Sequence, residues 1–261
     1  MHEVAKFGVG FSGQYQYYGT KSNPPNMSQQ TRHLQLPFQF DETKLLADLA
    51  RMQQSAWIPH FNTGGYEGDW KVIPLYAPGG DAANIMAHAP TAAAMAPTPI
   101  LAECTYFQAV IGTFKCPILS ARILRLSVGA EIKPHRDHAL GYEDGCFRLH
   151  IPIITNPEVH FVLDGEELTM RPGECWYTNV NFVHSVRNDG QADRMHLVID
   201  GERNAWSDEL FFGLAPKDSL IFAPAEEHSQ ETIRRMIEEL RRSEAPAAQA
   251  LIAEWERKLE E

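Results

Sequence analysis

The middle of the chain consists of short runs in which apolar and polar residues alternate, separated by Gly, Pro, Asn or Asp. Runs of this kind, rich in β-branched and aromatic residues, are typical of strands whose two faces meet different surroundings. We expect strands at residues 122–128, 147–155, 159–164, 167–170, 174–178, 185–187 and 195–200. A succession of short strands with such turns predicts a mainly β protein, with a double-stranded β-helix (jelly-roll) core over residues 121–201.

The segments on either side of this core follow other patterns. Residues 1–37 show no helical periodicity and are expected to form an irregular N-terminal arm, ahead of a domain that spans residues 38–225. Asp41 is expected to cap a flanking helix that braces the outside of the sheet. The Ala-, Pro- and Gly-rich residues 76–100 are interpreted as either a loop or a lid over a pocket. Apolar residues at helical spacing predict C-terminal helices over residues 226–261.

Composition and charge exclude several classes of partner. The net charge of −11 and the absence of a long Lys/Arg run argue against nucleic acid. The four cysteines form no Cys-x-x-Cys pair and are expected to be reduced thiols. The N-terminus lacks the apolar region of a signal peptide, and no run reaches the roughly 18 apolar residues that a spanning helix needs. We therefore expect a cytoplasmic protein that binds neither nucleic acid nor membrane.

A histidine and a carboxylate two residues apart suggest a metal site. His135 and Asp137 project from the same side of an extended segment, because side chains alternate along it. With the distant His184 they have the composition of a 2-His-1-carboxylate triad, which binds non-haem Fe(II) and leaves positions open for substrates. A single His-x-Asp among 11 histidines is a weak signal, but six of the 11 fall between residues 135 and 196. This crowding favours the metal interpretation.

Two strand-like runs near these residues each carry a basic face. Arg148 and His150 share one face of the first run, and Arg194 and His196 share one face of the second. Such faces can simply be solvated, as in many half-buried strands. They can also line the inside of a barrel and hold an anion there. Their position beside the candidate triad favours the anion site.

The segment 121–201 resembles the 2-oxoglutarate, Fe(II)-dependent oxygenases of the aspartyl/asparaginyl β-hydroxylase family, and is also similar to bacterial proline cis-4-hydroxylases. The resemblance lies in Arg122–Leu126, Lys133–Asp137, Phe147–His150, Gly173–Tyr177, Val183–Ser185 and Asp193–Asp200. These stretches occur in the family's order and cover about a third of the chain. The resemblance implies a cupin-like jelly roll.

The same resemblance implies an iron site made of His135, Asp137 and His184. One departure from the family changes the expected substrate. The vertebrate aspartyl/asparaginyl β-hydroxylases lack the carboxylate of the triad, whereas this chain has Asp137. The site is therefore more similar to that of the proline hydroxylases, and an epidermal-growth-factor-domain substrate is not expected.

Carried over to this chain, the family's pattern makes Arg194 the partner of the distal carboxylate of 2-oxoglutarate. Arg148 and His150 are similar to residues that bind a carboxylate, of 2-oxoglutarate or of an amino-acid substrate. Arg125, between two leucines, either faces the cavity and binds a substrate carboxylate or forms a salt bridge inside the barrel. Trp70 is either a core anchor or, by the resemblance to proline cis-4-hydroxylases, a residue near the substrate.

The expected function is that of an Fe(II), 2-oxoglutarate-dependent dioxygenase. It would use O2 to hydroxylate an unactivated C–H bond of an amino acid or amino-acid residue, and would release succinate and CO2. The substrate would be a small molecule or peptide with a carboxylate, and a homodimer is left open. One alternative is a non-catalytic cupin that binds metal or a small ligand, which would have no need of Arg194 or Arg148. Another is an interaction module that uses the C-terminal helices.

Overall fold

The computed structural model describes residues 30–52, 57–85, 93–137 and 139–221, together with Gly8–Val9, Tyr15–Gln16 and isolated positions between 234 and 259. The chain divides into two compact units, Met1–Ile221 and Phe222–Glu261. Most of the predicted N-terminal arm and of the predicted C-terminal helices lies outside the described residues. In the second unit, the positions described between 234 and 259 are helical apart from a turn at Arg241.

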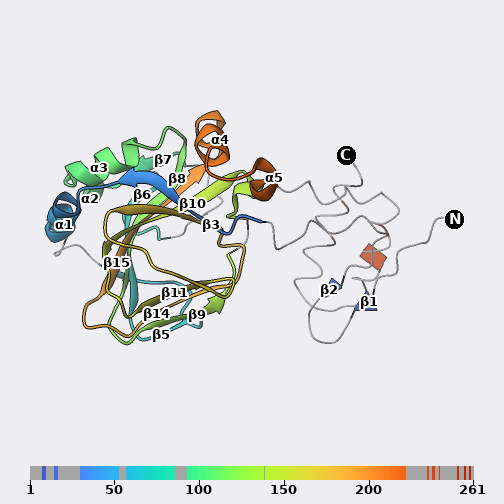
Figure 1. The fold of residues 1–261 in the computed structure, drawn as a ribbon, viewed down its shortest axis with the longest axis horizontal. Coiled ribbons are helices and arrows are strands. Elements are labelled where there is room, and N and C mark those ends of the chain that lie inside the picture. Colours follow the sequence, from blue (N-terminus) through green and yellow to red (C-terminus); the bar gives the residue numbers. More distant parts are fainter. Residues whose placement is uncertain are drawn as a thin grey trace. The chain divides into compact units, whose positions relative to one another are not determined.

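Two antiparallel sheets face each other and form the body of the first unit (Figure 1). The larger sheet contains, in spatial order, β3 (His33–Gln39), β13 (Glu174–Thr178), β10 (Cys146–Ile154), β15 (Arg194–Glu202), β8 (Ile118–Leu126), β6 (Trp70–Pro78) and β4 (Ile58–Pro59), with β7 (Met95–Pro97) also paired to β6. The smaller sheet contains β12 (Glu166–Leu168), β11 (Val159–Leu163), β14 (His184–Asn188), β9 (Glu131–His135) and β5 (Tyr66–Glu67). The predicted jelly-roll core is confirmed. A separate antiparallel pair joins β1 (Gly8–Val9) to β2 (Tyr15–Gln16).

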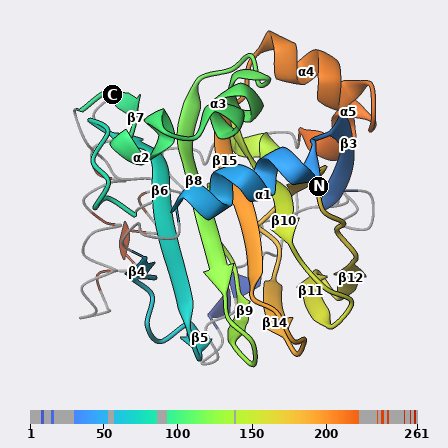
Figure 2. The same cartoon turned by 90° about the vertical axis from the view of Figure 1, so that its left-hand side faces the viewer.

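Helices flank the larger sheet. They are α1 (Glu42–Arg51), α2 (Pro99–Ala102), α3 (Thr105–Gly112), α4 (Ala205–Phe212) and α5 (Lys217–Leu220), with a 3₁₀ turn η3 (Tyr142–Asp144). Helix α1 crosses the outer face of the larger sheet (Figure 2). The Asp41 side chain accepts a hydrogen bond from the Lys44 backbone N–H at 3.1 Å, which confirms the predicted cap. None of the helices among the described residues is long and apolar enough to span a membrane.

Alternation along the strands of the larger sheet separates two apolar cores. The outer core lies under the helices and includes Leu45, Leu49, Ile73, Phe107, Ile123, Leu149 and Ile199. The inner core lies between the sheets and includes Trp70, Val72, Leu124, Leu126, Phe161, Val186 and Val198. Since Leu149 belongs to the outer core, Arg148 and His150 on β10 point between the sheets. Arg194 and His196 do the same on β15, and all four of these side chains are buried. The two basic faces are therefore interior and not solvated.

Two predicted boundaries differ from the structure. Strand β3 begins at His33 and pairs with β13, so the irregular arm expected over residues 1–37 ends before that strand. The segment 76–100 is not a continuous loop, because Tyr76 pairs with Pro97 and the ends of the segment form the β6–β7 hairpin. Residues 86–92, between these strands, lie outside the described residues. The distinction between a loop and a lid stays open there.

Candidate metal and carboxylate-binding site

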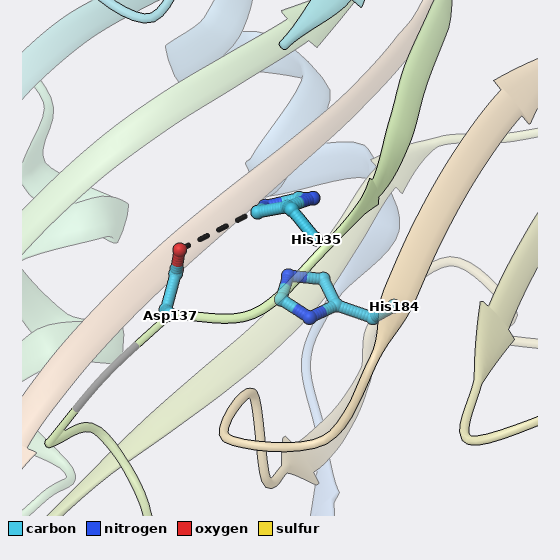
Figure 3. Close-up of side chains that lie close together, drawn as sticks. All are labelled: His135, Asp137 and His184. Atoms are coloured by element: carbon cyan, nitrogen blue, oxygen red, sulfur yellow. Dashed lines mark ion pairs between the residues drawn. The ribbon is translucent and has the colours of Figure 1, made fainter. Parts of the chain in front are cut away.

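Three candidate metal ligands converge at one end of the smaller sheet. His135 is the last residue of β9, Asp137 lies in the loop that follows, and His184 is the first residue of β14. The antiparallel pairing of β14 with β9 sets His184 opposite His135. One ligand atom from each of the three residues lies within 4.8 Å of the other two, and the side chains point toward one another (Figure 3).

Backbone groups orient the three side chains. The Nδ1 atom of His135 is 2.8 Å from the carbonyl of Lys133, and the Nδ1 atom of His184 is 3.0 Å from the carbonyl of Phe182. Each ring therefore donates from Nδ1 and keeps Nε2 for a metal. The Asp137 backbone N–H donates to the Val180 carbonyl at 2.9 Å, which ties the Asp137 loop to the segment that precedes His184.

The protonation states of these residues fit a transition metal. Burial, and then the neighbouring His135, lowers the pKa of His184 to about 4, so this imidazole is neutral near pH 7. Burial by itself raises the pKa of Asp137, but the attraction of Arg148 and His184 outweighs it and the pKa is lowered overall. Two imidazoles and one ionised carboxylate are the donor set of non-haem Fe(II) sites. The residues present therefore fit the implied iron.

Arg194 is a buried cation without an acidic partner among the described residues. Its side chain is 1% exposed, its Nη2 atom is 2.9 Å from Nδ1 of His196, and its Nε atom has no hydrogen-bond partner. Burial lowers its pKa to about 9, so the guanidinium is still charged near neutral pH. Arg194 and His196 line a cavity of about 40 Å³ between the sheets, beside Phe161. An unpaired buried charge is costly, so the arrangement calls for an anion.

His150 is close enough to both this cation and the candidate metal ligand His184 for their charges to act on it. Neither of its ring nitrogens has a hydrogen-bond partner, and its ring is 5.7 Å from that of His196. Burial, and then Arg194, lowers its pKa well below the ordinary value, and His184 also acts on it. A neutral, unpartnered imidazole can donate to a bound anion. This position agrees with the predicted carboxylate-binding role, which remains a prediction.

Arg148 is held by two carboxylates. Its Nε and Nη2 atoms donate to Asp200 at 2.7 and 3.2 Å, and its Nη1 atom donates to Asp137 at 2.5 Å. Asp200 also accepts from Arg122 at 3.1 Å and from the Ser120 hydroxyl at 2.8 Å. The predicted carboxylate-binding residue is thus already bonded to two side chains of the protein. Its role toward 2-oxoglutarate or a substrate stays a prediction.

Sequence reasoning did not predict that Arg122 and Asp200 join the buried charged groups beside Asp137. The signal that could have found them is alternation. Asp200 is an even number of residues from Arg194 on β15, so the two side chains share a face. Arg122 is two residues from Leu124 on β8, and the Leu124 side chain is in the inner core. Both residues therefore point between the sheets.

The prediction that Arg125 faces the cavity is wrong. Leu124 and Leu126 occupy the inner core, so Arg125 points from the opposite face of β8. Its guanidinium pairs with Asp69 at 3.0 Å and with Asp193 at 3.8 Å. The alternative of a salt bridge is correct, but the bridge is on the outer side of the sheet and not inside the barrel. Arg125 is therefore not available to a substrate in the cavity.

Trp70 is buried in the inner core and stacks on His60, with ring centroids 3.5 Å apart. The interpretation as a core anchor is correct, and its stacking partner connects it to the site. Burial, and then Arg122, lowers the pKa of His60 to about 4, with further effects of Asp137 and Arg148. No sequence motif marked His60. His60 is brought near the site because β4 pairs with β6, and β6 pairs with β8, the strand that carries Arg122.

Comparisons with known proteins show which chains this one is similar to. The family described as Aspartyl/Asparaginyl beta-hydroxylase matches residues 39–204. The chain is 28% identical to an L-proline cis-3-hydroxylase of Streptomyces, in an alignment that covers 64% of this chain. It is 27% identical to the L-proline cis-4-hydroxylase of Rhizobium meliloti, in an alignment that covers 66% of this chain. The chain spans 59% and 61% of these two relatives. A solved 2OG-Fe(II) oxygenase family protein from Burkholderia pseudomallei is 17% identical with a TM-score of 0.42, covering 66% of this chain and 88% of that one.

The fold, the site and the match over more than half of the chain define a class of protein. This chain belongs to the aspartyl/asparaginyl β-hydroxylase family.

Proposed function

We propose that this protein is a non-haem Fe(II), 2-oxoglutarate-dependent dioxygenase that hydroxylates an unactivated C–H bond of an amino acid or amino-acid residue. The observation that carries the proposal is Arg194, a buried guanidinium with no acidic partner among the described residues. Its strand, β15, pairs with the strand of Arg148, and Arg148 in turn donates to the candidate metal ligand Asp137. A metal-binding protein without a cosubstrate would carry this buried charge at a cost and to no purpose. The far carboxylate of 2-oxoglutarate would neutralise it.

The metal would be held by His135, Asp137 and His184, the three residues whose ligand atoms converge. Iron bound there supplies the activation of O2 that couples decarboxylation of 2-oxoglutarate to hydroxylation, with succinate and CO2 as products. The protein's own contribution is binding and orientation. Arg194 would grip the far carboxylate through its fork of donors, and the unpartnered His150 would donate to an oxygen along the same molecule.

The charges between the sheets support a substrate that carries a carboxylate. Among the described residues, the three guanidiniums of Arg122, Arg148 and Arg194 are buried there, and the carboxylates bonded to them are two, those of Asp137 and Asp200, which leaves an excess of one positive charge. A divalent metal raises this excess to three positive charges, and the 2-oxoglutarate dianion removes two. One further anionic group would complete the balance.

Arg122 is the residue we assign to the substrate carboxylate, in place of Arg125. It uses Nη2 for Asp200, and it acts electrostatically on His60, whose ring stacks on Trp70. A guanidinium beside an aromatic stack suits a small amino acid that has a carboxylate and an apolar body. The relatives named as L-proline hydroxylases make free L-proline the first candidate substrate.

The test is succinate formation from 2-oxoglutarate with Fe(II) and ascorbate, in the presence of each free amino acid in turn. Stimulation by one amino acid, with a product that carries one added oxygen atom, would establish both the reaction and the substrate class. Slow succinate formation without stimulation would keep the oxygenase and direct the search to peptides. Absence of succinate in protein that binds iron would favour the non-catalytic alternative.

A further inference from the structure

The two oxygens of the Asp137 carboxylate have different neighbours. Its Oδ1 atom is 3.7 Å from Nε2 of His135, on the side of the candidate metal ligands. Its Oδ2 atom instead accepts the hydrogen bond from Nη1 of Arg148 at 2.5 Å. One oxygen therefore faces the position of a metal, and the other is occupied by a cation of the protein.

Arg148 is itself fixed in place by Asp200. The two side chains are joined by a two-point bridge in which Nε and Nη2 of Arg148 donate to the two oxygens of Asp200. Asp200 is 0% exposed, and its Oδ2 atom also accepts from Ser120 and Arg122. Such paired hydrogen bonds between ionised groups are strong and directional. The direction of Nη1 toward Asp137 is therefore set by a residue on another strand, β15.

The occupied oxygen matters because a carboxylate can bind a metal through one oxygen or through both. A triad of this type is useful only if positions remain open for other ligands. If Asp137 turned to bind through both oxygens, it would take up one of those positions. A cation that holds Oδ2 prevents this turn.

We propose that Asp200 and Arg148 are positioning residues for the metal ligand Asp137: Asp200 holds Arg148, and Arg148 holds Oδ2 of Asp137 so that only Oδ1 binds the metal. This inference rests on the metal site of the proposed function. It differs from a role of Arg148 in binding 2-oxoglutarate, because the positioning role acts on the metal site before any cosubstrate is present.

Cobalt binding without 2-oxoglutarate distinguishes the two roles. Co²⁺ is titrated into the purified full chain and into Asp200→Asn and Arg148→Lys, with its visible absorption spectrum as the readout. We expect both variants to bind Co²⁺ about 10–100-fold more weakly, the usual effect of losing a partner of a metal ligand. We also expect a changed cobalt spectrum, because the coordination by Asp137 changes.

Asp48→Asn is the matched control. Asp48 is also a buried aspartate, 3% exposed, but it accepts from the backbone N–H groups of Tyr106 and Phe107 at the start of α3. Its loss should lower stability without altering the cobalt spectrum. If Asp200→Asn does not fold, Arg148→Lys decides, because a lysine keeps the charge but lacks the planar fork that bonds Asp200 at two points and still reaches Asp137.

The folded variants could bind Co²⁺ with wild-type affinity and spectrum and differ from the wild type only in weaker 2-oxoglutarate binding. That outcome would overturn the positioning role and leave the proposed function intact. Failure of the wild-type protein itself to bind Co²⁺ or Fe²⁺ would overturn the proposed metal site, and the positioning role with it. The two failures are therefore distinguishable.

Discussion

His184 lies directly opposite His135 in the antiparallel pairing of β14 with β9, with ring centroids 4.2 Å apart. The register of two strands thus brings together ligands from distant parts of the chain. A shift by one residue would turn one of the rings to the other face of the sheet. The metal site therefore depends on the packing that holds the register, including the buried Ile132 and Val186 that pair across the same two strands.

Removing a candidate ligand should abolish metal binding and turnover. Asp137→Ala and His184→Ala are each expected to weaken Fe²⁺ binding by more than about 100-fold, beyond the loss typical of partners outside the ligand set. Isothermal titration with metal and the succinate assay measure the two effects. His160→Ala is the control, because that ring pairs with Glu167 at 2.6 Å and is not in the cluster. A ligand variant that keeps most of its activity would contradict the assignment.

Replacing Arg194 should separate stability from cosubstrate binding. In Arg194→Met the unpaired buried charge is removed, so the free energy of unfolding of the metal-free protein should rise by about 1–4 kcal/mol. The 2-oxoglutarate requirement should rise at least about 30-fold, which corresponds to about 2 kcal/mol. Urea unfolding with and without 2-oxoglutarate and metal measures both. If 2-oxoglutarate stabilised Arg194→Met as much as it stabilises the wild type, Arg194 would not be the anion-binding residue.

The two arginines of β8 should have opposite phenotypes. Arg122→Ala is expected to raise the substrate concentration needed for half-maximal rate, because its guanidinium faces the interior. Arg125→Ala should leave the kinetics unchanged and lower the free energy of unfolding by no more than about 1 kcal/mol, as is usual for partly exposed ion pairs. Steady-state kinetics of the two variants decides. Impaired substrate binding in Arg125→Ala alone would reverse the assignment.

His60 should make the metal-free protein sensitive to acid. The pKa of His60 is about 4 in the folded protein, whereas the ordinary value of 6.5 applies to the unfolded chain. As pH falls, the unfolded chain therefore takes up a proton before the folded protein does. Its contribution to stability is fully present above pH 6.5 and is lost as pH falls through 4, on the order of 2 kcal/mol after solvent screening. His60→Asn should flatten the urea-unfolding profile over that range. An unchanged profile would mean that other groups carry the acid sensitivity.

Local pattern was sufficient for much of the fold and for two of the three candidate ligands, His135 and Asp137. Alternation placed His135 and Asp137 on one side of an extended segment, and it paired Arg148 with His150 and Arg194 with His196. The cap at Asp41 was equally readable, since one short side chain and one backbone N–H three residues away define it. These relationships lie within a few residues of each other, where chain geometry determines which side chains share a face.

Alternation states which residues share a face but not which face is inside. On β8, both faces carry an arginine and apolar residues. Alternation alone therefore could not decide that Arg122 points inward and Arg125 outward. The inner core resolves it, because Leu124 packs there with residues of the other sheet. Burial is a property of the packed pair of sheets and not of one strand.

The sequence by itself therefore determined the strand pattern, the local capping and the likeness of the ligand set to an iron triad. Only the tertiary structure decided that Asp200 meets both Arg122 and Arg148, and that Arg148 in turn holds Asp137. The reason is physical. These contacts join β8, β10, β15 and the loop after β9, and they exist only once the sheet order and register have formed.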